Sequence, residues 1–173
     1  NHEGFKGCFK DFLKHEPLNL TVEEIIERSS NVGTIKIVNN SNIDNVEEFL
    51  KKFGFGSRTG VELSGESKGS FTEYNTCKTC LSSLSIGYSI NTTQYQMVKG
   101  YSIIANGGND IQLSLLRNLD QNVNQKSIIS NDLSNRLKKL LINVVEGDNG
   151  TGKSLRMNGY VIGGKTGTSR TYL

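Results

Sequence analysis

The sequence is poor in cysteine, with only Cys8, Cys77 and Cys80 among its 173 residues. So small and odd a number excludes a disulfide framework as the organising principle of the fold. Cys77 and Cys80 have the spacing of half a zinc site, but no second Cys/His pair follows, and both histidines lie far upstream. We therefore interpret the cysteines as incidental loop residues and expect no metal.

The sequence also lacks long apolar runs and dense basic blocks. Residues 137–145 form one of the longest apolar runs, but Lys and Asn interrupt it well before the roughly 20 residues that cross a bilayer. We expect no membrane span and no signal peptide here, and any anchor to lie outside this sequence. The formal net charge is +3, and 21% of the residues are charged. No Lys/Arg block is dense enough to favour nucleic-acid binding.

The sequence does contain clear helix signals. Thr21 and Glu24 have the spacing of a capping box, which predicts a short helix that ends at the turn-favouring residues 29–33. Apolar periodicity and end signals predict four more helices: one over 34–38, one over 44–53, one from Thr92 or Thr93 to 106–108, and one that Ser130 caps and Gly147 ends. Residues 54–79 are predicted as loop and 111–116 as a weak strand.

Near the C-terminus, residues 160–173 combine apolar residues with glycines and are predicted to form an exposed strand. Lys165 supplies a positive charge, and Thr166 and Thr168 supply hydroxyls, while Gly167 leaves the backbone open to close approach. Such a set suits a carboxylate or a developing oxyanion. A Lys-Thr-Gly strand occurs in serine β-lactamases and penicillin-binding proteins, but by itself it is equally compatible with a plain edge strand.

A second motif, Ser29-Ser30-Asn31, falls at the predicted helix break. A break of this kind can aim a hydroxyl and an amide into a cleft. In the alternative interpretation, Ser29 or Ser30 only caps the next helix. The order of the two motifs, S-x-N upstream of Lys-Thr-Gly, favours acyl-transfer chemistry.

Taken together, residues 21–172 resemble the transpeptidase domain of class B high-molecular-weight penicillin-binding proteins, of the type that serves cell division or elongation. The matching stretches are Ser29-Ser30-Asn31-Val32-Gly33, Phe53-Gly54-Phe55-Gly56, 59–69, Ser85-Ile86-Gly87-Tyr88-Ser89-Ile90, Thr93-Gln94, 105–108, 144–146, 150–153 and 164–168. Several short motifs in one order are far more specific than any one of them.

The resemblance implies a serine enzyme that attacks the D-Ala-D-Ala bond of a peptidoglycan stem peptide and is acylated by β-lactams. It implies that Ser29 relays a proton to the leaving amine, that Asn31 binds the substrate backbone, and that Lys165 supports Ser29. It assigns the Thr166 and Thr168 hydroxyls to the substrate carboxylate, with the Thr168 N–H in the oxyanion hole and Gly167 between them. It requires no cofactor.

The sequence departs from the family at the nucleophile, because no serine stands three residues before any of its lysines. The family takes its nucleophile and general base from such an S-x-x-K motif. We therefore expect the nucleophile to lie outside this chain, upstream of Asn1, and the chain to be an internal fragment that is inactive alone.

We predict an α+β fold of the penicillin-binding protein and serine β-lactamase type, an antiparallel sheet with packed helices. Residues 1–173 would form part of one transpeptidase domain. Residues 1–55 would be a helical subdomain that carries Ser29-x-Asn31, and 56–173 would hold the Lys165-Thr166-Gly167 strand, with the helix 131–146 packed on the sheet. The resemblance further implies cell-wall synthesis proteins as partners and a place on the extracytoplasmic, periplasmic side of a bacterial inner membrane.

Two alternatives remain open. The first is a serine β-lactamase or β-lactam sensor, which would need a base for deacylation, and Glu66 and Glu73 are the acidic candidates in a suitable loop. The second is a catalytically dead module that keeps the fold and binds cell-wall partners.

Overall fold

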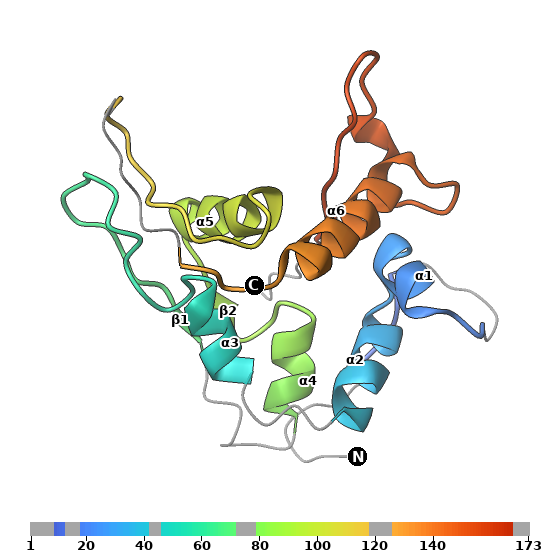
Figure 1. The fold of residues 1–173 in the computed structure, drawn as a ribbon. Coiled ribbons are helices and arrows are strands. Elements are labelled where there is room, and N and C mark those ends of the chain that lie inside the picture. Colours follow the sequence, from blue (N-terminus) through green and yellow to red (C-terminus); the bar gives the residue numbers. More distant parts are fainter. Residues whose placement is uncertain (1–8, 13–17, 42–45, 72–78, 118–125, 168–173) are drawn as a thin grey trace. The chain divides into compact units, whose positions relative to one another are not determined.

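The computed structural model describes residues 9–12, 18–41, 46–71, 79–117 and 126–167 (Figure 1). Its elements, in chain order, are α1 (Val22–Glu27), α2 (Asn31–Asn40), α3 (Val46–Lys52), β1 (Ser70–Phe71), α4 (Cys80–Ser85), β2 (Ile90–Asn91), α5 (Gln94–Ala105), α6 (Asn131–Glu146) and the 3-10 helix η2 (Lys153–Leu155). Within the described part of the chain, helices dominate and the two short strands pair antiparallel. No helix there is long and apolar enough to cross a membrane.

The chain divides into two compact units. Unit 1 combines Asn1–Asn42 with Leu140–Leu173, and unit 2 is Ile43–Lys139. The S-x-N segment and the Lys165 segment therefore belong to the same unit, although more than a hundred residues separate them in sequence. The proposed subdomain boundary at residue 55, which was drawn from motifs, stays a prediction.

Unit 2 is built around the buried side chains of Phe53, Ile103 and Ile129. A capping box starts α5, and of the two predicted caps, Thr92 and Thr93, it is Thr93 whose Oγ1 accepts from the N–H of Gln96. The Gln96 side chain is fully buried and donates to the carbonyls of Ser57 and Lys68, both at 2.8 Å. A single buried amide thus ties the loop that contains Ser57 and Lys68 to α5.

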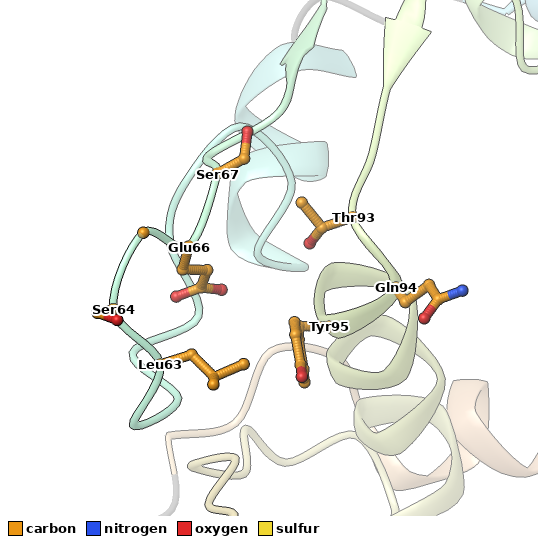
Figure 2. Close-up of a pocket in the computed structure, with 8 residues that line it drawn as sticks. Leu63, Ser64, Glu66, Ser67, Thr93, Gln94 and Tyr95 are labelled. Atoms are coloured by element: carbon orange, nitrogen blue, oxygen red, sulfur yellow. The ribbon is translucent and has the colours of Figure 1, made fainter.

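A shallow hollow of about 270 Å³ opens between this loop and the start of α5 (Figure 2). Glu66 lies in its wall, and its carboxylate accepts from the N–H and the hydroxyl of Thr59 and from the N–H of Gly60. The hydrogen bond from the Thr59 hydroxyl is the main cause that lowers the pKa of Glu66. The Glu66 carboxylate is therefore ionised, and its hydrogen bonds join the two sides of this loop.

In unit 1, α1 and α2 lie side by side at the blue end of the ribbon (Figure 1). Gly33 permits this approach, because a Cβ at Gly33 would come within 2.7 Å of the Ile25 side chain. The capping box predicted at Thr21 and Glu24 is present at the start of α1. The predicted cap of α6 is also confirmed, since Ser130 Oγ accepts from the N–H of Leu133.

Two predictions about regular structure were wrong, and one helix was not predicted. Residues 111–116 form no strand, and residues 160–167, the described part of the predicted C-terminal strand, are assigned to no strand either. A strand exists only where a neighbour pairs with its backbone, and in the described part of the chain no such neighbour is assigned to either segment. The short helix α4 was not predicted, because its six residues lie between the predicted loop 54–79 and the helix predicted from Thr92 or Thr93.

The cysteines also need a correction. Cys80, the first residue of α4, is disulfide-bonded and so is not an incidental thiol. Cys8 and Cys77 lie outside the described residues. Disulfide pairing depends on proximity in space, which cysteine counting does not reveal.

Candidate active site

Ser29 lies at the end of α1 in a backbone conformation that usually requires glycine. The N–H of Ser29 donates to the Ile26 carbonyl and the N–H of Ser30 to the Ile25 carbonyl, which is the pairing of a Schellman motif. Ser29 occupies its left-handed position with φ 55°. A residue with a Cβ is disfavoured there by roughly 1–2 kcal/mol, and strain of this kind concentrates at functional positions.

Ser30, and not Ser29, is the residue that caps the helix α2. Its hydroxyl accepts from the N–H of Gly33 at 3.0 Å and so caps α2, and it donates to the Asp11 carboxylate at 3.0 Å. Asp11 also accepts from the N–H of Val32. Because Ser30 provides the cap, the hydroxyl of Ser29 has no part in starting the helix.

The Ser29 hydroxyl instead meets Lys165. Lys165 Nζ donates to Ser29 Oγ at 2.5 Å and to the Thr166 carbonyl at 3.0 Å. Partial desolvation lowers the pKa of Lys165 from its ordinary value, although the residue is exposed to solvent. An ammonium group that donates to a hydroxyl makes that hydroxyl a better proton donor to a third group.

The backbone of the Lys165 segment rests against α6. The N–H of Gly164 donates to the Leu141 carbonyl at 3.0 Å. A Cβ at Gly163 would lie only 3.3 Å from the backbone nitrogen of Ile142. Glycine at 163 therefore allows the segment to lie close to the helix, which fixes the point from which Lys165 reaches Ser29.

Thr166 contacts a residue to which sequence reasoning gave no role. The hydroxyls of Thr151 and Thr166 lie 2.7 Å apart. Thr151 in turn donates to the Glu27 carbonyl, from its N–H at 3.3 Å and from its hydroxyl at 3.4 Å. The sequence offered one signal, the glycines that flank Thr151, but it could not show that this turn meets α1.

The other predicted site residues are placed less tightly. The Asn31 amide donates to the Lys10 carbonyl at 3.3 Å. Gly167 is exposed. Thr168 and Glu73 lie outside the described residues. The structure thus brings together Ser29, Lys165, Thr166 and the additional Thr151, while Asn31 uses its amide elsewhere.

Taken as chemistry, the cluster offers a cation, a hydroxyl polarised by that cation, and a hydroxyl pair. These groups can stabilise an anion and pass a proton, which are the needs of acyl transfer. No group of three or more metal-binding side chains occurs in the part of the chain that the structure describes.

The chain as a whole is similar to proteins of one known family. The family model of the penicillin-binding protein transpeptidase domain matches residues 2–173, and the chain belongs to this family.

Among the relatives, the penicillin-binding protein PbpB of Mycolicibacterium smegmatis is 30% identical over 93% of this chain and 27% of its own length. The peptidoglycan D,D-transpeptidase FtsI of Buchnera aphidicola is 32% identical over 95% of this chain and 28% of its own length. The chain therefore spans about a quarter of the length of these relatives.

Solved structures confirm the α+β transpeptidase fold. Penicillin-binding protein 3 of Mycobacterium tuberculosis, crystallised with ampicillin, superposes with a TM-score of 0.82 at 28% identity, covering 92% of this chain and 38% of that one. The same protein with aztreonam also gives 0.82.

Proposed function

We propose that this chain is part of a peptidoglycan D,D-transpeptidase that cross-links stem peptides through a serine acyl-enzyme. The observation that carries the proposal is the hydrogen bond from Lys165 to Ser29, which joins the two motifs that the chemistry needs. The family and the name of the Buchnera relative support the reaction. The nucleophilic serine belongs to an S-x-x-K motif that this chain does not contain.

In the proposed mechanism, the serine of the S-x-x-K motif, outside this chain, gives its proton to the lysine of that motif, attacks the carbonyl carbon of the D-Ala-D-Ala bond and forms an ester. The bond to the leaving D-alanine amine breaks, and that nitrogen takes a proton from the Ser29 hydroxyl. The protonated lysine of the S-x-x-K motif then returns a proton to Ser29, so the proton lost by the nucleophile ends on the leaving amine. Lys165 donates to Ser29 Oγ and so stabilises the negative charge that develops on it. An amine from a neighbouring stem peptide then resolves the ester.

The remaining roles follow the family pattern as proposals. Asn31 would hydrogen-bond the substrate backbone after exchanging its contact with the Lys10 carbonyl. The Thr166 and Thr168 hydroxyls, on either side of Gly167, would bind the substrate carboxylate.

β-Lactams would acylate the same enzyme, as the ampicillin and aztreonam complexes of the Mycobacterium tuberculosis relative support. The domain would work on the extracytoplasmic face of the bacterial inner membrane with other cell-wall synthesis proteins.

One observation weighs against a β-lactamase. The Glu66 carboxylate accepts three hydrogen bonds, and its pKa is lowered, so it is a poor base for activating water. The non-catalytic alternative predicts that the full-length protein is not acylated by penicillin, which the following experiment measures.

The experiment is acylation of the full-length protein by a fluorescent penicillin, followed on a denaturing gel. We expect stoichiometric labelling of the wild type, a strong loss in Ser29→Ala and no change in Ser41→Ala, whose exposed hydroxyl only contacts the Ile37 carbonyl at the end of α2. If the full-length protein is not labelled, the non-catalytic module is correct. Equal labelling of all three would mean that Ser29 has no part in acylation.

A further inference from the structure

We propose that Thr151 is a positioning residue that orients the Thr166 hydroxyl toward the carboxylate of the substrate or β-lactam. This inference rests on the proposed function and adds a residue to that site. Its basis is the 2.7 Å contact between the two hydroxyls, made across 15 residues of sequence.

The turn that carries Thr151 is tightly held. The N–H of Gly152 donates to the Val144 carbonyl at 2.8 Å, and the N–H of Gly150 donates to the Gly147 carbonyl at 3.1 Å. A Cβ at Gly150 would come within 2.4 Å of the Val144 carbonyl oxygen. The glycines on both sides of Thr151 let the turn fold back on the end of α6, so the position of its hydroxyl is set by the backbone.

Glu27, the last residue of α1, fastens this turn to the helix that leads into Ser29. Its carboxylate accepts from the N–H of Asn149 at 2.9 Å, and its carbonyl accepts from the N–H of Thr151. A Cβ at Gly147 would lie 2.3 Å from the Glu27 carboxylate, so the two are in close contact. One helix end therefore fixes both Ser29 and Thr151.

The proton arrangement explains how Thr151 can act. A carboxylate only accepts hydrogen bonds, so Thr166 must donate its single proton to it. Thr166 Oγ1 then still has lone pairs, and the Thr151 hydroxyl can donate to them by turning away from its long 3.4 Å contact with the Glu27 carbonyl. A hydroxyl that accepts one hydrogen bond donates a stronger one, and the effect is largest toward an anion.

The test measures benzylpenicillin acylation of the full-length protein, separating the dissociation constant Kd from the rate constant of the bound complex. Thr151→Val removes the hydroxyl at nearly constant shape and should raise Kd roughly three- to tenfold, the worth of one hydrogen bond. The rate constant of the bound complex should not change. Thr151→Ser should restore Kd, and Lys153→Ala should leave Kd unchanged, because Lys153 lies in the same region but contacts only the Asp148 carbonyl.

Two further measurements exclude a merely structural role. With benzylpenicillin methyl ester, which lacks the anionic carboxylate, Thr151→Val should bind as the wild type does. The Thr151→Val/Thr166→Val double variant should resemble Thr166→Val alone, because Thr151 acts through Thr166.

The possible failures are distinguishable. If the wild type is not acylated, both the proposed function and this inference are wrong. If the wild type is acylated but Thr151→Val matches it, or loses the acid and the ester equally, only the role of Thr151 is overturned.

Discussion

Ser29 combines a strained backbone with a functional side chain, and the two can be separated by substitution. Ser29→Ala and Ser29→Gly both remove the hydroxyl, but only glycine relieves the left-handed conformation at φ 55°. The glycine variant should therefore be more stable to unfolding than the alanine variant by about 1 kcal/mol. Denaturant titration measures this difference. Equal stabilities would mean that position 29 is not left-handed in solution.

Lys165 and Lys153 are two lysines of the same glycine-rich region, and only Lys165 contacts a site residue. Lys165→Ala should slow penicillin acylation roughly a hundredfold, since a charge-assisted contact that strengthens in the transition state is worth about 3 kcal/mol. Lys153→Ala should hardly matter, because its contact with the Asp148 carbonyl is exposed. The check is the second-order acylation rate constant of variants with matched Tm. Equal effects would remove the basis for assigning a catalytic role to Lys165.

The lowered pKa of Lys165 gives a pH signature. Donation to Ser29 needs the ammonium form, so acylation should fall as pH rises through a pKa below the ordinary 10.5. The free energy of unfolding has the opposite pH dependence. In the unfolded chain Lys165 keeps its proton up to the ordinary pKa of 10.5, so between the lowered pKa and 10.5 the unfolded state binds more protons, and the free energy of unfolding rises with pH. In Lys165→Arg the alkaline limb of the acylation profile should move to higher pH, because guanidinium stays protonated. A limb that does not move belongs to another group.

At the scale of elements, the contact between the end of α1 and the turn 147–152 holds Thr151 beside the helix end that leads into Ser29. Glu27→Ala removes the acceptor for the Asn149 N–H and should raise Kd for benzylpenicillin in the same direction as Thr151→Val. Glu27→Gln keeps an acceptor oxygen and should behave nearly as the wild type. The measurement is the Kd of both variants for benzylpenicillin. An alanine variant with the wild-type Kd would show that the turn holds Thr151 in place without Glu27.

The same elements show what sequence can and cannot predict. The caps at Thr21, Thr93 and Ser130 were predictable because each is a contact between residues three apart. Ser29 and Lys165 were indicated by motifs, but their contact joins residues 136 apart. The contact between Thr151 and Glu27 spans 124 residues and carries no local pattern. Pairing in space therefore had to come from the structure.

At the scale of the whole molecule, the 173-residue chain has Ser29 next to Lys165 but no S-x-x-K motif. We therefore expect chain 1–173 alone to give no covalent adduct with penicillin. The reason is that the hydroxyls of this chain have no paired base of the S-x-x-K kind. Lys165 Nζ contacts Ser29 Oγ and the Thr166 carbonyl, and in its ammonium form it can only donate to them, whereas a general base would have to accept the serine proton.

Intact mass spectrometry and a denaturing gel after incubation with a fluorescent penicillin test this expectation. The full-length protein, labelled under the same conditions, is the positive control, and circular dichroism establishes that the isolated chain is folded. A stoichiometric adduct would contradict the prediction, and peptide mapping would then locate it. An adduct on Ser29 would mean that Lys165, with its lowered pKa, gives up its proton and activates Ser29 directly, so that Ser29 is the nucleophile and not a proton relay.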